Sequence, residues 1–454
     1  MFTVEEVLEA TEGRLISGDP KVVIPAISID SRTIEPGELF VAVRGKNFDG
    51  HDFVSQVLSK GAVGAVVSNS SIATLSRVLI RVNDTIKALG DIANFHRRRF
   101  SIPIIGITGS NGKTTTKDMV ASIVSQRYTT LKNDLSFNNF IGLPLTLLRL
   151  TQAHQVGVVE LGSSRLGEIK RLSEVARPTH GLITNVGSSH LEFFGSVDAV
   201  YREKLELLAS LGENSTALIN GDDQRLLRLA WRFGIKVITF GMGESCDFRA
   251  TRISYQTDGL SFLLNESLPI ELKLLGRHNV YNALASIAMA QVFGLDLDLV
   301  RQALLAFRPP FGRMEQKMFG QIKVIDDTYN SNPQSMGCAI ETLSRNSIGR
   351  KILVSGDMLE LGEGTRLAHY RMGKKVAEAG IDLLIIVGRF AKEIAGGALR
   401  YGMREAEVFV VDSHNEVNQM LLKMLKEGDT VLIKGSRATK MEKVVESLVN
   451  QMKT

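Results

Sequence analysis

The sequence predicts an α/β protein with three domains, which we expect over residues 1–100, 101–313 and 314–454. The chain has 454 residues, which is more than one ordinary domain holds. From residue 101 onward, apolar strands alternate with helical segments in two successive series, and this alternation is typical of mainly parallel sheets. Hydrophobic residues make up 44% and charged residues 23% of the chain, so a largely disordered chain is excluded.

The first 100 residues are expected to form a small mixed α/β domain. Runs rich in β-branched residues, bounded by glycine, proline or charge, predict its strands at residues 21–27, 38–43, 61–67 and 78–82. The basic run at residues 96–100 is interpreted as the solvated end of a helix. Pro103 and a strong apolar strand follow this run, which places the domain boundary near residue 100.

The two later series predict two α/β domains joined by an extended linker at residues 308–313, which contains two prolines and a glycine. In the central domain, a helix should begin after His278-Asn279 and run to Gly294, because glycine is a common helix stop. The third domain is expected to be Rossmann-like. The predicted strands are residues 102–108, 156–162, 180–186, 216–221 and 236–241 in the central domain, and 322–328, 351–357, 383–388, 408–411 and 430–436 in the third.

A glycine-rich loop, GITGSNGKTTT at residues 106–116, follows the first central strand and opens a helix. Gly109 and Gly112 would let backbone amides approach a phosphate closely. Lys113 could neutralise phosphate charge, and the Thr114 hydroxyl could bind Mg²⁺. The spacing is a variant, because five residues separate Gly106 from Gly112 where the usual pattern has four. A surface glycine turn is the alternative, but the strand–loop–helix context favours a nucleotide-binding, P-loop ATPase-like domain.

Two residues at strand ends are candidates for a metal site. Glu160 ends a predicted strand, and the carboxyl ends of parallel strands line the ligand crevice of such a sheet. A carboxylate there is a natural Mg²⁺ ligand, although a solvated glutamate is an equal alternative. His190 lies just beyond the next strand. A lone histidine is more often structural than a metal ligand. The position of His190 at a second strand end favours the metal interpretation only moderately.

Lys204 lies on the apolar stripe of a predicted helix whose apolar positions are 197, 200, 201, 208 and 211. One interpretation is a lysine at the stripe margin that extends to water. The other is a lysine that points into a site, where its amine could add CO₂ and become an anionic carbamate ligand for a metal. The pattern alone slightly favours the first. Asn279 could simply cap the next helix, whereas Asn282 could contact the edge of a nucleotide base. The sequence favours neither interpretation.

Composition excludes several classes of protein. Cys246 and Cys338 are the two cysteines, so a disulfide-rich scaffold is excluded. There is no run of 18 apolar residues and no apolar signal core, so we expect no membrane span and a cytoplasmic location. Nucleic-acid binding rests only on a net charge of +5 and the basic run at 96–100. No basic groove interleaved with aromatic residues accompanies them, so no nucleic-acid partner is expected.

Taken together, the motifs resemble those of the Mur ligases, the ATP-dependent enzymes that add amino acids to the bacterial cell-wall precursor. The matching pieces occur in order along the whole chain: DSRTIEPGELFVAVRGKNFDGHDF, GITGSNGKTTT, ELG, ITNVGSSHLEFFGS, EKLEL, LGRHNVYNALA, FGRME and DDTYNSNP. The set is highly specific, although no single piece is. Three stretches, at residues 326–336, at 356–363 and from Asn138 onward, most resemble the family member that adds a D-alanyl-D-alanine dipeptide.

The resemblance implies an activity and its partners. The expected enzyme is an ATP-dependent ligase that joins D-Ala-D-Ala to UDP-N-acetylmuramoyl-tripeptide through an acyl phosphate, with ATP and Mg²⁺ as cofactors and a monomeric chain. Two alternatives within ligases are a member that adds the third peptide residue and a folylpolyglutamate-type ligase. A non-catalytic P-loop switch or a transport ATPase is a further alternative, but it would not explain matching motifs in two more domains.

The resemblance also implies roles for single residues. For ATP they are Gly109, Asn111, Gly112, Lys113, Thr114, Thr115, Asn279, Asn282, Arg313, Asp327 and Tyr329, and for the metal Thr114, Glu160, His190 and Lys204 as a carbamate. Lys113, Glu160, His190 and Lys204 are thereby the expected catalytic residues. For the substrates they are Ser31, Arg32, Asn138, Asn139, Asn330, Asn332 and Lys434. The chain departs from the family pattern near these positions, with Ser163-Ser164 in place of Ala-Asn, Ser331 in place of alanine and Ile29 in place of threonine.

Overall fold

The computed structural model describes residues 1–45, 47–69, 77–134 and 137–452. It divides into two compact units. The first comprises Met1–Gly106, Thr129–Leu161 and Lys170–Pro178, and the second comprises Ile107–Tyr128, Gly162–Ile169 and Thr179–Thr454. No helix among the described residues has both the length and the apolar character needed to cross a membrane. The predicted domain boundaries near residues 100 and 313 stay predictions.

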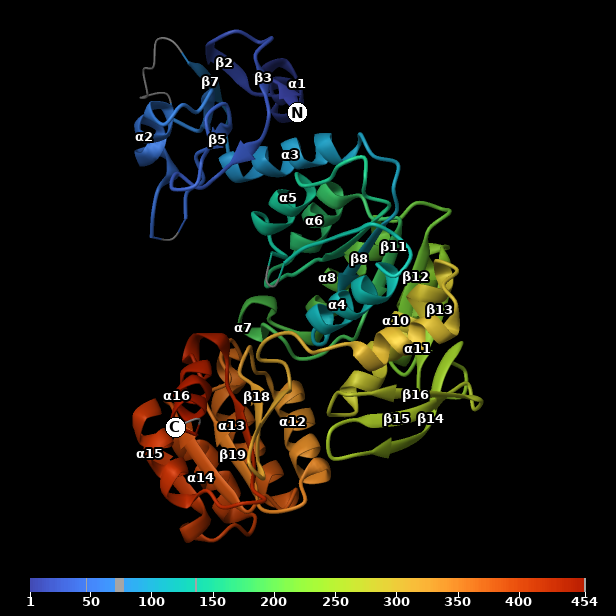
Figure 1. The fold of residues 1–454 in the computed structure, drawn as a ribbon, viewed down its shortest axis with the longest axis vertical. Coiled ribbons are helices and arrows are strands. Elements are labelled where there is room, and N and C mark those ends of the chain that lie inside the picture. The colour runs from blue at the N-terminus through green and yellow to red at the C-terminus, as the bar shows by residue number, and fades with distance from the viewer. Residues whose placement is uncertain (46, 70–76, 135–136, 453–454) are drawn as a thin grey trace. The chain divides into compact units, whose positions relative to one another are not determined.

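The first unit begins with a sheet whose strand order is β2-β7-β6-β5-β4 (Figure 1). Strands β4 to β7 pair in parallel, and β2 is antiparallel to β7. Apolar residues of this sheet form two buried clusters, which the helices of this part of the chain complete. The elements are β1 (Phe2–Thr3), α1 (Val4–Thr11), β2 (Arg14–Ser17), β3 (Val23–Ile24), β4 (Ile27–Ser28), β5 (Leu39–Val41), α2 (Val54–Ser59), β6 (Gly64–Val67), β7 (Val78–Arg81) and α3 (Thr85–Arg97).

The basic run at residues 96–100 does end α3, but its predicted solvation is wrong for its first two residues. His96 and Arg97 are buried. The Arg97 guanidinium donates hydrogen bonds to the carbonyls of Ala176, at 3.0 Å, and Ile102, at 2.9 Å. Burial lowers the pKa of Arg97 to about 10. Arg97 therefore joins the end of α3 to the end of α6 (Glu168–Ala176) instead of facing water.

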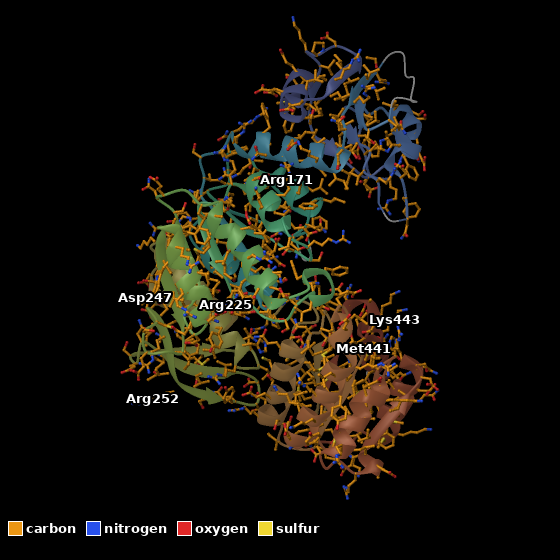
Figure 2. The ribbon with its side chains drawn as sticks, turned by 180° about the vertical axis from the view of Figure 1, so that it is seen from behind. Arg171, Arg225, Asp247, Arg252, Met441 and Lys443 are labelled. Atoms are coloured by element: carbon orange, nitrogen blue, oxygen red, sulfur yellow. The ribbon has the colours of Figure 1, made fainter. Side chains whose placement is uncertain are left out.

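A second contact between α3 and α6 lies within the same unit. Arg171 of α6, labelled in Figure 2, forms an ion pair with Asp91 of α3 at 2.6 Å. The unit also holds β9 (Thr130–Lys132), α5 (Gly142–Leu147) and β10 (Val156–Glu160). Here the strand order is β8-β10-β9, with β9 and β10 parallel. Strand β8 (Ile104–Thr108) contributes its first three residues to this unit and its last two to the second.

The second unit continues from β8 in the order β8-β11-β12-β13-β14-β15-β16. Strands β11, β12 and β13 pair in parallel, as the strand–helix alternation predicts. The sequence analysis did not include β14, which pairs in parallel with β13, or the antiparallel strands β15 and β16. The β14–β15 register shifts between Thr251 and Ser254, and Arg252 between them has a φ of 49° (Figure 2). The strands are β11 (His180–Ile183), β12 (Thr216–Asn220), β13 (Lys236–Gly241), β14 (Phe248–Tyr255), β15 (Leu260–Leu264) and β16 (Leu268–Leu272).

Helices of this part of the second unit are α4 (Lys113–Val124), α7 (Leu191–Phe194), α8 (Val197–Ala209), α9 (Gln224–Ala230), α10 (His278–Val292) and α11 (Leu297–Ala306). Helix α10 packs against α4. It starts at His278, two residues earlier than predicted, and Gly294 follows its end with a φ of 67°. The backbone at Gly294 is therefore in the left-handed region that a glycine stop adopts.

The C-terminal part of the second unit has the strand order β17-β18-β22-β19-β20-β21. All pairs are parallel except β17 with β18. One buried cluster packs α12, α13 and α14 against the sheet, and another packs α15 and α16 (Figure 1). This is the expected doubly wound arrangement. Its elements are β17 (Glu315–Phe319), β18 (Ile322–Asp327), α12 (Pro333–Asn346), β19 (Lys351–Ser355), α13 (Thr365–Glu378), β20 (Leu383–Val387), α14 (Ala391–Arg400), β21 (Val408–Val411), α15 (His414–Met424), β22 (Thr430–Lys434) and α16 (Glu442–Met452).

Candidate nucleotide-binding and ligase site

The glycine-rich loop lies between β8 and α4, and two of its glycines are required by geometry. Gly109 has a φ of 143°, and an added Cβ would lie 2.1 Å from Thr184 Oγ1. Gly112 has a φ of 80°, and its Cβ would lie 2.5 Å from Asn282 Oδ1. Lys113 opens α4, and its Nζ donates hydrogen bonds to the carbonyls of Gly109, at 2.8 Å, and Ser110, at 3.1 Å. The Lys113 side chain therefore folds back onto the backbone of its own loop.

A chain of hydrogen bonds joins α4 to α10. Thr116 Oγ1 donates to Asn282 Oδ1 at 3.1 Å, Asn282 Nδ2 donates to Asn279 Oδ1 at 2.9 Å, and Asn279 Nδ2 donates to the Leu275 carbonyl at 2.8 Å. Both asparagines are buried. Asn279 is the second residue of α10, and Arg277 at the cap position makes no side-chain cap. The helix-cap interpretation of Asn279 is therefore not supported.

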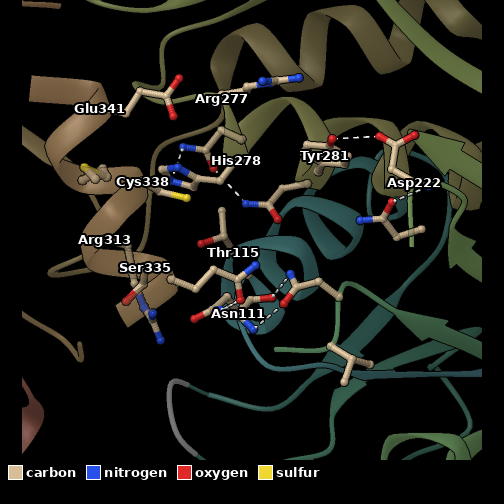
Figure 3. Close-up of a pocket in the computed structure, with 18 of the residues that line it drawn as sticks. Asn111, Thr115, Asp222, Arg277, His278, Tyr281, Arg313, Ser335, Cys338 and Glu341 are labelled. Carbon is tan, nitrogen blue, oxygen red and sulfur yellow. Dashed lines mark hydrogen bonds between the residues drawn. The ribbon is translucent and has the colours of Figure 1, made fainter. Parts of the chain in front are cut away.

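A pocket of about 660 Å³ brings together loop residues, α10 and the C-terminal strands (Figure 3). Eight of the residues that the sequence analysis singled out line it: Asn111, Gly112, Thr115, Asn279, Asn282, Arg313, Asp327 and Lys434. They come from the central series, from the linker and from the ends of β18 and β22. The pocket thus brings the two helix asparagines together with the end of the phosphate loop and the start of α4.

Sequence reasoning missed a polar network on one wall of this pocket. Tyr281 Oη donates to Asp222 Oδ2 at 2.8 Å (Figure 3), and Asp222 also accepts from the backbone amides of Met242 and Gly243, each at 2.8 Å. Burial, followed by the contact with Asp222, raises the pKa of Tyr281. Asp222 follows β12, so the strand-end rule that indicated Glu160 could also have found it.

The C-terminal wall of the pocket holds a buried ion pair. Lys434 Nζ lies 2.6 Å from Asp327 Oδ2 and also donates to the Asn330 carbonyl at 2.9 Å. The Arg313 guanidinium lies 4.0 Å from the centre of the Tyr329 ring. Burial lowers the pKa of His278, which lines the same cavity, so its neutral form is favoured. Arg313 of the linker thus contacts Tyr329, which follows β18, and Lys434 of β22 contacts Asp327 of β18.

A second cavity, of about 290 Å³, lies beside His190. His190 Nδ1 is 2.5 Å from Glu360 Oε2, and both residues have positive φ, 52° and 61°. The cavity is also lined by Asn330, Ser331, Asn332 and Arg437. Asn332 caps α12, because its Oδ1 accepts from the Ser335 amide at 2.8 Å. The structure thus brings a predicted metal residue close to two predicted substrate residues.

Lys204 is buried, with 1% of its surface exposed, so the interpretation that it extends to water is wrong. The apolar stripe of α8 carries it inward, beside Val200 and Leu208, which are also buried. Its Nζ donates to Ser163 Oγ at 2.7 Å and lies 5.9 Å from the centre of the Phe194 ring. Burial raises the pKa of the neighbouring Glu203 carboxyl. The Lys204 amine therefore contacts protein groups and is shielded from solvent.

In the first unit, Glu160 and Asn138 contact each other. Asn138 Nδ2 donates to Glu160 Oε1 at 2.7 Å. Glu160 is buried at the end of β10, which contradicts the solvated alternative. Asn139 has a structural contact, because its Oδ1 accepts from the Gly142 amide at 2.9 Å at the start of α5.

The predicted sugar-binding pair lies elsewhere in the first unit. Arg32 is exposed and forms an ion pair with Asp30 at 2.6 Å. Lys60 Nζ donates to the Ser31 carbonyl at 2.8 Å. Arg32 is thus held within its own loop, and Ser31 is held by the lysine at the end of α2.

The predicted metal ligands come from both units, with Glu160 in the first and Thr114, His190 and Lys204 in the second. Across the part of the chain that the structure describes, no three His, Cys, Asp or Glu side chains are grouped so that they could hold a metal ion. The predicted set contains only two residues of these types, since its other donors are a hydroxyl and a carbamate. This ligand set therefore stays a prediction.

Three family models match the chain. The Mur ligase family catalytic domain matches residues 23–97, the Mur ligase middle domain matches 107–290, and the Mur ligase glutamate ligase domain matches 312–437. The UDP-N-acetylmuramoyl-tripeptide--D-alanyl-D-alanine ligase of Bacillus subtilis is 35% identical over 98% of both chains. The ligase of the same name from Synechocystis is 36% identical over 100% of this chain and 98% of its own.

Solved structures give the same result. The chain is similar to MurF from Acinetobacter baumannii, with a TM-score of 0.91 and 32% identity over 100% of this chain and 99% of that one. MurF from Thermotoga maritima, solved in complex with ADP, has a TM-score of 0.85 and 28% identity over 94% of this chain and 98% of that one. Folylpolyglutamate synthase from Mycobacterium tuberculosis, at 18% identity, has a TM-score of 0.63 and shares the fold alone.

Proposed function

The chain belongs to the Mur ligase family, and we propose that it joins D-alanyl-D-alanine to UDP-N-acetylmuramoyl-tripeptide at the expense of ATP. The product is the pentapeptide precursor of peptidoglycan. Support for the dipeptide as co-substrate comes from relatives of that name, which this chain matches over nearly its whole length. The third-residue-adding ligases and the folylpolyglutamate ligases are less well supported, because their solved structures share less than 25% identity with this chain.

The observation that carries the nucleotide part of the proposal is the 660 Å³ pocket that the phosphate loop shares with α10. Its loop end offers backbone amides at the start of α4, where an anion is favoured. The α10 residues Asn279, Asn282 and Tyr281 also line the pocket, and their polar groups could face a purine. The T. maritima relative holds ADP, and we place ATP in the corresponding pocket of this chain.

We propose Mg²⁺ as the metal, with the Thr114 hydroxyl, His190 and a carbamate on Lys204, all in the second unit, as ligands that would hold it. The donors are mostly oxygen, as Mg²⁺ prefers, once the lysine amine carries CO₂. The buried position of Lys204 beside Phe194 supports this chemistry, because a desolvated amine favours its neutral, nucleophilic form. Bound Mg²⁺ would neutralise the negative charge that develops on the transferred phosphoryl group.

The reaction needs activation because a free carboxylate has no good leaving group. Transfer of the γ-phosphoryl group from ATP to the tripeptide carboxylate makes an acyl phosphate and releases ADP. The amine of D-Ala-D-Ala then forms a C–N bond to the acyl carbon, the C–O bond to phosphate breaks, and the amine proton passes to solvent. Lys113 would stabilise the phosphate charge during transfer.

The remaining predicted residues are assigned to the two substrates. The cavity of about 290 Å³ beside His190 is proposed for the dipeptide, since Asn330 and Asn332 line it. Ser31 and Arg32 are proposed for the UDP-sugar, and Asn138 and Asn139 for the muramoyl peptide. Lys434, which forms an ion pair with Asp327, is proposed to lie next to the phosphate. We further propose a monomer that works in the cytoplasm, where ATP is supplied.

The test is incubation of the purified chain with ATP, Mg²⁺, D-Ala-D-Ala and one UDP-N-acetylmuramoyl peptide at a time. The mass of each product is then measured. A product heavier than the tripeptide by one dipeptide less one water is expected, and Lys113→Ala should reduce its formation by roughly 100-fold or more. Lys236→Ala, an exposed lysine at the start of β13, is the control and should be unaffected. Phosphate release without any amide product would instead indicate an ATPase.

A further inference from the structure

Ser163 lies next to the lysine that we propose as the carbamate, and no role has yet been assigned to it. Lys204 Nζ donates a hydrogen bond to Ser163 Oγ at 2.7 Å. Ser163 lies in the loop after Glu160-x-Gly162. An alanine at this position could not accept this bond, so the contact depends on the serine hydroxyl.

A second buried residue, Glu203, precedes Lys204 in the chain and holds the same loop. The Glu203 carboxyl accepts hydrogen bonds from the amides of Gly167 and Ile169, both at 2.7 Å, and is fully buried. In the contact between Lys204 and Ser163, Nζ is the donor, so a lone pair of the Ser163 oxygen points to Lys204.

The chemistry of a carbamate makes this direction consequential. The lone pair of the neutral Lys204 amine attacks CO₂, an N–C bond forms, one C=O electron pair moves to oxygen, and nitrogen loses a proton to solvent. One N–H remains on the planar carbamate. An acceptor fixed for that N–H sets the rotation of the plane and hence the direction of both carbamate oxygens.

We propose that Ser163 is a positioning residue, which holds the remaining N–H of a carbamate on Lys204 and thereby aims its oxygens. This inference rests on the proposed function, because it requires the carbamate. Ser163 accepts from the amine and from the carbamate alike, so it sets orientation and not occupancy. Residues that orient a metal ligand typically change metal affinity or activity by roughly 10- to 100-fold when they are replaced.

The experiment uses the full chain with ¹³C-labelled bicarbonate and records the carbamate carbon signal by NMR, together with kcat and the affinity for Mn²⁺ in the presence of ADP. In Ser163→Ala we expect a carbamate signal of undiminished intensity but changed shift or width, with kcat and Mn²⁺ affinity lowered by roughly 10-fold or more. Ser163→Thr, which keeps the hydroxyl, should recover the native signal and both constants.

Ser164→Ala is the matched control, because the Ser164 hydroxyl lies in the same loop but contacts Glu168 at 3.4 Å. It should behave as the native chain. A Ser163→Ala variant with native signal, kcat and Mn²⁺ affinity would overturn the positioning role. Absence of any carbamate signal in the active native chain would instead overturn the proposed carbamate, and with it the premise of this inference.

Discussion

At the scale of single residues, buried charged side chains are the ones whose surroundings change their pKa. Asp326 is fully buried on β18, where its Oδ1 accepts hydrogen bonds from Thr328 Oγ1, at 2.7 Å, and the Thr328 amide, at 3.2 Å. Its Oδ2 lies 3.6 Å from Lys317 Nζ. Burial, the largest effect, raises the pKa of Asp326 despite these contacts. The neighbouring Asp327 differs, since Lys434 contacts it directly at 2.6 Å.

Asp326→Asn should therefore stabilise the fold at neutral pH. A carboxyl whose pKa is raised on folding holds its proton more tightly in the folded state, so its contribution to the unfolding free energy falls as pH rises from the unfolded pKa through the folded one. The asparagine keeps an oxygen for Thr328 and does not titrate. We expect the variant to be more stable than the native chain at pH 7, with the difference closing toward acid.

Urea unfolding of both chains across a pH series measures this difference. Asp52→Asn, at an exposed position in the first unit, serves as the control. A difference between Asp326→Asn and the native chain that stays constant with pH would contradict the burial effect.

At the scale of elements, the strand–loop–helix unit formed by β8 and α4 could be predicted almost completely. Its glycine spacing, the preceding apolar strand and the following helix are all local features of the sequence. What the pattern could not show is why Gly112 must be glycine. Its Cβ would lie 2.5 Å from Oδ1 of Asn282, which is 170 positions further along the chain on α10.

Gly112→Ala should weaken nucleotide binding as well as the fold. The left-handed backbone costs a non-glycine residue about 1–2 kcal/mol, and the clash with Asn282 displaces the loop in addition. We expect a lower unfolding temperature and loss of the stabilisation that ATP gives to the native chain. Thermal unfolding with and without ATP measures both effects.

Gly234→Ala is the matched variant, because Gly234 also has a positive φ, 67°, but an added Cβ meets nothing within 4 Å. It should lose similar stability yet keep the full response to ATP. Equal ATP responses in the two variants would show that the close approach to Asn282 is unimportant.

At the scale of the whole molecule, the second unit is joined through contacts between distant segments. Asn111 Nδ2 donates to Gln334 Oε1 at 2.9 Å, and Asn332 Nδ2 donates to Asn111 Oδ1 at 2.8 Å. The phosphate loop is thereby attached to the start of α12, beyond the linker at residues 308–313. Nucleotide binding at the loop and the position of the C-terminal strands are thus physically connected.

Asn111→Ala should loosen this attachment. Two hydrogen bonds are lost, each with a net value of roughly 0.5–1.5 kcal/mol, so we expect the linker at residues 308–313 to be cleaved several-fold faster by a protease added in small amounts. Gln126→Ala is the control, since the Gln126 side chain donates a hydrogen bond within its own segment, to the Ser122 carbonyl at 3.1 Å. Unchanged cleavage in Asn111→Ala would mean that other contacts hold the two parts together.

Most of the strand series, the phosphate loop and the family could be predicted from the sequence, because each depends on residue periodicity, turn residues or spacing within a short segment. The burial of Arg97, the extension of the sheet by β14, β15 and β16, and the contact of Lys204 with Ser163 became visible in the folded chain alone. A buried polar side chain needs a partner, and that partner comes from whichever distant segment packs beside it. Local patterns do not contain that information.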